Sequence, residues 1–264
     1  MLSFEHRGRL GCLLLLFSLT ATTGAMAELQ LFSQESGGIV DLEGRTRLEV
    51  QGFNGLVSVR ASKPGELRYQ ARGRTNRREE RPVDLWLDER TLRFVPNAAA
   101  PDEPLILEIA VGSGVSTAID VSGSSVRASS LGGPLEIRGA DLEVDVRTVD
   151  GQVQLVLDGG SVLLQDIADQ VEVEGKNLEL RLQEIKGYVS LDLEDSDVRV
   201  IAVEESVSGD LVRSQFNAAG VLGRLELSAD GGQVEMNAIR GGCELELDDT
   251  PLVLTETGGV TYVR

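Results

Sequence analysis

Residues 135–152 read LEIRGADLEVDVRTVDGQ, and the next 18 residues, 153–170, read VQLVLDGGSVLLQDIADQ. Aliphatic residues take the same places in both segments, and the spacing continues beyond them. One column contains Leu135, Val153, Val171, Val189, Val207, Leu225 and Cys243. A fixed period of this kind is typical of a repeat protein, in which each unit packs on its neighbours.

Each repeat shows the alternation of a β-strand. Aliphatic residues stand two positions apart, as Val144 and Val146 do, so alternate side chains turn inward. Three sets of such columns begin at Leu131, Leu135 and Val144, which predicts three sides to each coil. A corner glycine precedes the first strand, where a sharp turn gains from a residue that tolerates positive φ. This glycine column consists of Gly133, Gly151, Gly187, Gly223, Gly241 and Gly259.

Coils stacked in register bury these columns, because each strand then pairs in parallel with the strands above and below it. We therefore predict an all-β fold, a right-handed-type parallel β-solenoid (β-helix) of 18-residue coils with an irregular N-terminal β segment. A left-handed helix of six-residue repeats is excluded, because Leu135 plus six is Asp141. A calcium roll is excluded because Asp158-Gly159-Gly160 lacks the second half of the G-G-x-G-x-D motif.

Residues 28–112 lack the strict period but alternate as strands do, for example over Leu48–Val50. They form either irregular first coils or a small sandwich that caps an otherwise open sheet edge. Residues 96–104, PNAAAPDEP, read as a surface loop. Residues 113–130 have the pattern of a degenerate coil and begin the predicted repeat region, 113–264.

Residues 1–27 have the features of a secretory signal sequence. They contain charged residues near the start, an apolar run over Leu10–Leu19 and small residues at Ala25 and Ala27. We expect cleavage before Glu28 and export to the periplasm, the cell surface or the medium, with no transmembrane segment in the mature chain. A membrane anchor is the alternative, but it needs about 20 apolar residues, and this run is shorter.

Removal of the signal sequence leaves no histidine and one thiol, Cys243. Ser-His-Asp and Cys-His nucleophile systems and His-containing zinc sites are therefore excluded, and a disulfide lacks its second cysteine. We expect no cofactor and no metal site. Cys243 stands in an inward column, so we expect a buried thiol that packs as a small hydrophobic residue.

The chain has a net charge of −18, and residues 131–264 carry −17 of it, from 10 Lys and Arg against 27 Asp and Glu. Such a surface repels nucleic acid and attracts cations or basic partners. Outward positions of the first strand stack acidic residues at the 18-residue step, with Ser190 and Ser208 among them. The candidate ligand-binding residues on this acidic ladder are Glu172, Glu174, Asp192, Asp210, Glu226, Glu244 and Glu246. The ladder binds divalent cations or a basic ligand, or it is a solvated face that prevents sheet-to-sheet aggregation.

A basic cluster is the second candidate binding site. It lies between the strands near Tyr69 and Leu85, where we expect a hairpin loop, and it consists of Arg72, Arg74, Arg77, Arg78 and Arg81. Guanidinium groups suit a phosphate, an anionic glycan or the acidic rod of a neighbouring molecule, and a solvated loop is the alternative. Trp86 is able to stack on a sugar, but burial against a second sheet is the stronger expectation.

The stretch from Leu48 to Val59 (LEVQGFNGLVSV), the strand Leu105–Val111 and the repeated G-x-[VL]-x-[VL] coils resemble a bacterial β-strand-repeat family of putative adhesins, a domain of unknown function. The resemblance covers about residues 46–264. It implies a parallel β-solenoid and brings no catalytic residues with it. Asp169 and Glu205 depart from the glycine column of this family.

Together these features predict an exported, non-catalytic adhesin, envelope scaffold or polymer-binding surface, with surface polymers, glycans or other envelope proteins as partners. The alternative is a polysaccharide-active lyase or hydrolase, which uses carboxylate-bound calcium with a basic residue, or paired carboxylates. Short, uniform coils without long loops leave no walled cleft for such chemistry. A groove in which clustered carboxylates face Lys or Arg would favour the enzyme.

Overall fold

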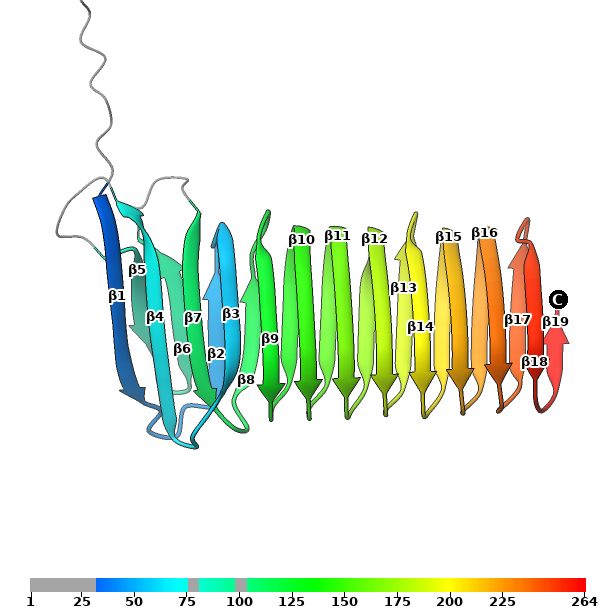
Figure 1. Ribbon diagram of the computed structural model, residues 1–264, viewed down its shortest axis with the longest axis horizontal. Helices are drawn as coiled ribbons and strands as arrows, with labels where there is room; N and C mark the ends of the chain where they lie inside the picture. The colour runs from blue at the N-terminus through cyan, green and yellow to red at the C-terminus, as the bar shows by residue number, and fades with distance from the viewer. Residues whose placement is uncertain (1–31, 76–80, 98–103) are drawn as a thin grey trace, which may run out of the picture. The chain divides into compact units, whose positions relative to one another are not determined.

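The computed structural model describes residues 32–75, 81–97 and 104–264, so the predicted signal sequence lies outside the described residues. The described residues form 19 β-strands. No helix long and apolar enough to cross a membrane occurs among them. The strands are arranged in about eight stacked coils (Figure 1). This arrangement confirms the all-β solenoid of 18-residue coils.

Each regular coil contributes one strand segment to each of two faces of the stack. The first face contains β8, β13, β17 and β19, and the second contains β9, β14 and β18, while the longer strands bend from the first face to the second. Their bounds are β8 Ser116–Asp120, β9 Ser125–Leu131, β10 Leu135–Val149, β11 Val153–Ile167, β12 Val171–Ile185, β13 Val189–Glu194, β14 Asp197–Val203, β15 Val207–Val221, β16 Leu225–Ile239, β17 Cys243–Asp248, β18 Leu252–Thr257 and β19 Thr261–Val263.

The register between coils is parallel with a step of 18 residues. Val171 pairs with Val189, and Val189 pairs with Val207, so equivalent side chains lie over one another. These inward side chains are buried and form one continuous core, where each contributes about 1.5–3 kcal/mol by burial. Val144 pairs with Val126, so the coil predicted over residues 113–130 is confirmed.

Each coil has two sides, and the predicted third side is wrong. Val126 and Leu131 belong to the same strand, β9, as do Val146 and Val149 in β10. Thr148 has a positive φ of 57°, and this left-handed residue shifts the alternation. Val146 and Val149 therefore both face the core although they stand three positions apart.

Left-handed backbone recurs in two columns, each with the 18-residue step, and it makes the bends of the coil. The first column has φ values between 44° and 83° and consists of Gly123, Asp141, Gly159, Asn177, Asp195, Arg213, Gly231 and Asp249. The second has φ values between 54° and 71° and consists of Ser130, Thr148, Asp166, Glu184, Ala202, Gly220, Ala238 and Glu256.

The glycine column lies at the corner before the first strand, as predicted, but for a different reason. Of its six members only Gly259 has a positive φ. A Cβ atom on Gly187 would lie 2.5 Å from the carbonyl carbon of Asp169, one coil earlier. Glycine is therefore favoured at position 187 because successive corners approach each other closely there, although Asp169 and Glu205 take the same place in two other coils.

Two irregular coils precede the regular ones, and their order in the stack differs from their order in the chain. The first consists of β2 (Arg47–Gln51) and β3 (Gly55–Ser62), and the second of β6 (Thr91–Pro96) and β7 (Leu105–Gly112). Strand β2 pairs in parallel with both β6 and β8, and β3 pairs with both β7 and β9. The earlier coil therefore lies between the later one and the regular stack.

Antiparallel strands complete the N-terminal part. Strand β1 (Phe32–Asp41) pairs with β4 (Glu66–Thr75), which pairs with β7, while β5 (Val83–Leu87) pairs with β6. Of the two alternatives for this part of the chain, the irregular coils are present. The division of the chain at residue 112 stays a prediction. Most of the expected loop over residues 96–104 lies outside the described residues.

Candidate functional site

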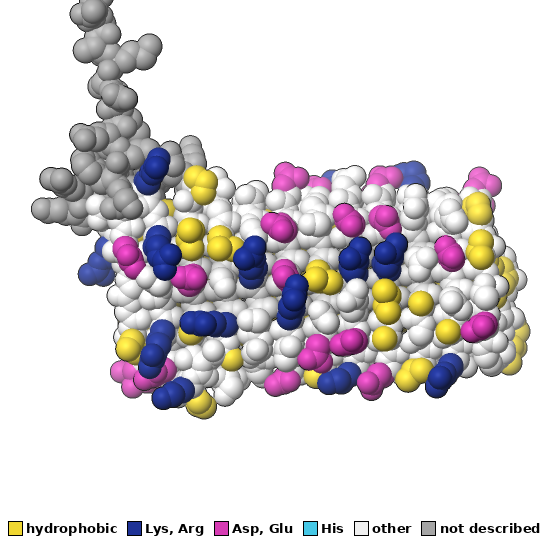
Figure 2. Space-filling model, viewed as in Figure 1, with side chains coloured by type: hydrophobic (Ala, Val, Ile, Leu, Met, Phe, Trp, Pro, Cys, Tyr) yellow, Lys and Arg dark blue, Asp and Glu magenta, His cyan; other side chains and the backbone are white. Residues whose placement is uncertain are grey.

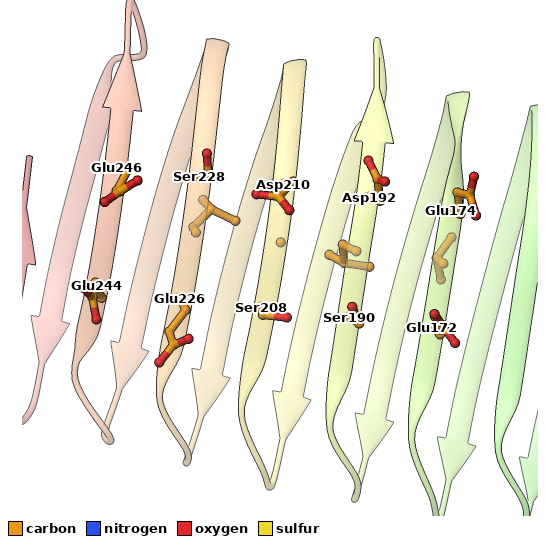
Figure 3. A pocket seen from close by; sticks show the side chains of 14 residues that line it. Glu172, Glu174, Ser190, Asp192, Ser208, Asp210, Glu226, Ser228, Glu244 and Glu246 are labelled. Atoms are coloured by element: carbon orange, nitrogen blue, oxygen red, sulfur yellow. The ribbon is translucent and has the colours of Figure 1, made fainter.

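The acidic ladder lies on the outer side of the first face, from β12 to β17 (Figure 3). Strand alternation turns these side chains outward, and the parallel register aligns them from coil to coil. One row contains Glu174, Asp192, Asp210, Ser228 and Glu246. The row two residues earlier contains Glu172, Ser190, Ser208, Glu226 and Glu244. All seven predicted acidic residues therefore lie on one surface.

The acidic ladder surrounds a shallow groove of about 490 Å³. Ser190 and Ser208 form part of its lining, and their short side chains lie between the longer Glu172 and Glu226 (Figure 3). Ser228 also lines the groove, although the sequence analysis did not single it out. The groove is therefore lined by serines as well as by carboxylates.

A second hollow adjoins the groove and shares Glu174 and Asp192 with it. It also contains Asp158, Lys176 and Glu194, and Lys176 lies 3.1 Å from Asp158. These three residues were missed by the sequence analysis. The same 18-residue step, applied to the next outward position, would have found them.

The carboxylates of the groove fall into two groups. Arg224 forms ion pairs with Glu226, at 3.1 Å, and with Glu244, and Arg264 lies 3.0 Å from Glu246. By contrast, no ion pair or hydrogen bond to a described residue is present for the side chains of Glu172, Glu174, Asp192 and Asp210. We call these four the unpaired carboxylates.

Among the described residues, no group of three or more His, Cys, Asp and Glu side chains has an arrangement that could hold one metal ion. The unpaired carboxylates come from three neighbouring coils, whose strands are about 4.8 Å apart. The groove therefore presents spaced negative charges along the stack.

Toward the N-terminal coils, the first face carries paired charges. Glu136 lies 2.5 Å from Arg138, and Glu49 accepts hydrogen bonds from Arg47 at 2.9 Å and Arg93 at 2.8 Å. Burial raises the pKa of Glu49, but the hydrogen bonds from Arg93 and Arg47 outweigh it and bring the pKa below the ordinary value of 4.5. These carboxylates are therefore compensated by neighbouring arginines, unlike the unpaired carboxylates of the groove.

The second face mixes charges of both signs (Figure 2). Arg127 and Asp145 are neighbours in one outward row. In the same row Arg181 lies two coils after Asp145, and Arg199 lies on the next coil. Arg147 lies 2.7 Å from Asp145. The acidic groove is thus a property of one face and not of the whole repeat.

The basic cluster is not a hairpin loop in the part that the structure describes. Arg72 and Arg74 lie in β4, which pairs with β1 and β7, while β5 pairs with β6. The guanidinium of Arg72 lies 3.4 Å from Glu108 and 3.9 Å from Glu35. Arg81 precedes β5, and Arg77 and Arg78 lie outside the described residues. The described arginines therefore lie on either side of residues 76–80, and a binding role for the cluster stays a prediction.

The burial predicted for Trp86 is wrong, whereas the burial predicted for Cys243 is confirmed. Trp86 is 63% exposed, so its expected burial against a second sheet is wrong: β5 is an end strand, and its outward face meets solvent. Cys243 is 1% exposed, which confirms the buried thiol. Burial raises the pKa of Cys243, and a hydrogen bond with Thr261 opposes this in part, so the thiol stays protonated at neutral pH.

The solved structures that are similar to this chain include two proteins named for cell adhesion. One is a putative adhesin from Parabacteroides distasonis, with 11% sequence identity, a TM-score of 0.39, and coverage of 88% of this chain and 97% of the other. The second is a putative cell adhesion protein from Clostridium sporogenes, with 8% identity, a TM-score of 0.28, and coverage of 88% and 100%. No family model matches the sequence, and no curated protein matches it.

Proposed function

We propose that this protein is an exported, non-catalytic binding surface, an adhesin or envelope scaffold, whose acidic groove contacts a basic partner. The observation that carries the proposal is the set of unpaired carboxylates on the first face. Like charges on neighbouring coils repel each other, and a cationic partner relieves this repulsion. The partner class is a cationic surface polymer, an amino-sugar glycan or a basic envelope protein.

The openness of the groove supports binding without catalysis. Coils β10–β17 are joined by turns of only a few residues, so no described loop covers the carboxylates or excludes water from them. Carboxylates do lie near Arg224 and Arg264, as the enzyme alternative requires. Both arginines, however, already form ion pairs with Glu226, Glu244 and Glu246. We expect no release of reducing ends from a panel of polysaccharides.

Export is part of the proposal and rests on the charged start, apolar run and small residues of positions 1–27. N-terminal sequencing of the mature protein from its native host should give Glu28 as the first residue. A mature chain that retains residues 1–27 in the cytoplasm would contradict export and leave the groove proposal standing.

Binding to immobilised poly-lysine, to an amino-sugar polymer and to neutral dextran tests the groove. We expect the protein to bind the first two, and binding should fall as salt screens the charges. A triple variant, Glu174→Gln, Asp192→Asn and Asp210→Asn, should lose about tenfold or more in affinity, about 1.4 kcal/mol or more.

The matched control removes three acidic charges from the second face: Glu143→Gln, Glu179→Gln and Asp197→Asn. These residues are exposed, and their side chains form no ion pair with a described residue. The control variant should bind as the wild type does. If both triple variants lose the same affinity, net charge alone explains the effect. If the wild type binds neither cationic polymer, the groove is refuted as the binding surface.

A further inference from the structure

Exposed apolar side chains gather at the two ends of the described stack. Among the described residues, seven large hydrophobic side chains are between 47% and 65% exposed, and the other exposed ones reach at most 45%. The seven are Ile39 in β1, Trp86 and Leu87 in β5, Val253 in β18, Val260 before β19, and Tyr262 and Val263 in β19. Between the two ends, the exposed large hydrophobic side chains of the described residues are less exposed, at 36–45%. Exposed patches of this kind mark interaction surfaces.

The same strands are the free edges of the two faces. Among the described residues, β1 pairs only with β4, and β5 only with β6. At the other end β18 pairs only with β16, and β19 only with β17. Each edge presents backbone N–H and C=O groups that are able to pair with another chain.

The strand directions at the two ends are compatible. Strand β1 is antiparallel to β4, which is antiparallel to β7, so β1 runs in the same direction as the strands of the second face, including β18. A second molecule placed end to end would continue this face with a parallel β18–β1 pair. On the first face, β19 would meet β5 in antiparallel orientation.

Net charge favours contact between unlike ends of two molecules over contact between like ends. Residues 243–264 contain five Asp and Glu and one Arg. The described residues of the opposite end, 32–75 and 81–97, contain ten Lys and Arg and eight Asp and Glu. Two acidic ends repel each other, whereas an acidic end attracts the slightly basic one.

We propose that this protein associates head to tail with further copies of itself, through β18 and β19 of one molecule and β1 and β5 of the next. A heterologous contact of this kind does not close on itself and produces short linear oligomers. The proposal does not depend on the acidic groove, which lies on the outer side of the first face and remains accessible in the oligomer.

Sedimentation velocity of the mature protein over a range of concentrations tests the proposal. The weight-average mass should rise with concentration. One variant blocks the N-terminal end with Ile39→Glu and Trp86→Glu, and another blocks the C-terminal end with Val253→Glu and Tyr262→Glu. Each should weaken self-association by about 100-fold or more, about 2.7 kcal/mol, because a carboxylate then replaces an apolar side chain at the joint and would have to be buried there. The control, Ile201→Glu and Leu222→Glu in the middle of the stack, should associate as the wild type does.

Mixing the two blocked variants gives the decisive result. Each retains one native end, so a head-to-tail contact predicts 1:1 dimers in the mixture and monomers in each variant alone. A wild type that stays monomeric, a loss of association in the control, or dimers of the N-terminally blocked variant alone would overturn the proposal. Circular dichroism checks the fold of each variant, and serine replaces glutamate at any position where folding fails.

Discussion

At the scale of single residues, the coil imposes a left-handed backbone on side chains that resist it. The first left-handed column contains mainly Gly, Asp and Asn, which tolerate positive φ. Arg213 is an exception, and its guanidinium donates hydrogen bonds to Asp195 of the preceding coil at 2.8 and 2.7 Å. The second column contains Thr148, Glu184 and Ala202, which gain nothing comparable from the conformation. Backbone strain is therefore concentrated in the second column.

Thr148 is the clearest case, because a β-branched residue at a φ of 57° is an outlier. Asparagine tolerates this conformation better, so Thr148→Asn should raise the free energy of unfolding by about 1 kcal/mol. Thr255→Asn is the matched control, since Thr255 is exposed in β18 without a positive φ. Chemical denaturation of both variants measures the difference. Equal stabilities would show that position 148 carries no strain.

At the scale of elements, the regular coils were predictable and the irregular ones were not. The position of a residue in the 18-residue period determines whether it points inward or outward, so Val171, Cys243 and the acidic rows could be placed from the sequence. The two-sided coil could not, because it depends on the left-handed residue at Thr148. The ion pairs of Arg224 were also unpredictable, since they join side chains on different coils.

The arrangement of the N-terminal coils could not be predicted from a repeating sequence pattern. Strand β2 pairs with β8, so Leu48 lies beside Thr117, and no period connects positions so far apart. The exposure of Trp86 follows from the end position of β5 in the stack. Alternation alone gives the direction of a side chain but not whether another layer covers it.

Glu49 links two strands of the first face, β2 and β6, and gives this region a pH dependence. Its pKa lies below 4.5, so its contribution to stability is present above the pKa of the unfolded chain and is lost as the pH falls through the folded-state value. Glu49→Gln should lower the free energy of unfolding at pH 7 by about 0.5–1 kcal/mol, after allowance for solvent screening. Below about pH 4 the difference should shrink.

Denaturation of the wild type and of Glu49→Gln between about pH 3 and pH 7 measures this dependence. Glu179→Gln serves as the control, because the side chain of Glu179 is exposed and forms no ion pair with a described residue. A constant difference between wild type and Glu49→Gln across this range would contradict the depressed pKa.

At the scale of the whole molecule, the stack is held together by contacts between successive coils. Inward side chains of one coil lie over those of the next, and the core is a single cluster that extends from Leu42 to Leu245. Stability is then a sum over coils and their interfaces. A coil is the unit that can be removed without disturbing the rest, provided that the register is preserved.

Deletion of residues 153–170 removes one such unit and joins Gln152 to Val171. Val153 and Val171 occupy equivalent places, so Leu135 should pair with Val171 and every inward column should stay inward. We expect a folded protein that is less stable by about 1–3 kcal/mol, as measured by thermal or chemical unfolding.

Deletion of residues 153–169 removes one residue fewer and should prevent folding of the later coils. Gln170 then takes the place of Val153, and a shift by one residue turns the inward side chains of β12 outward. Nearly the same length of chain is lost in both deletions, so a difference between their circular dichroism spectra and unfolding transitions reports the register alone. Equal stability of the two variants would mean that the 18-residue period does not hold the stack together.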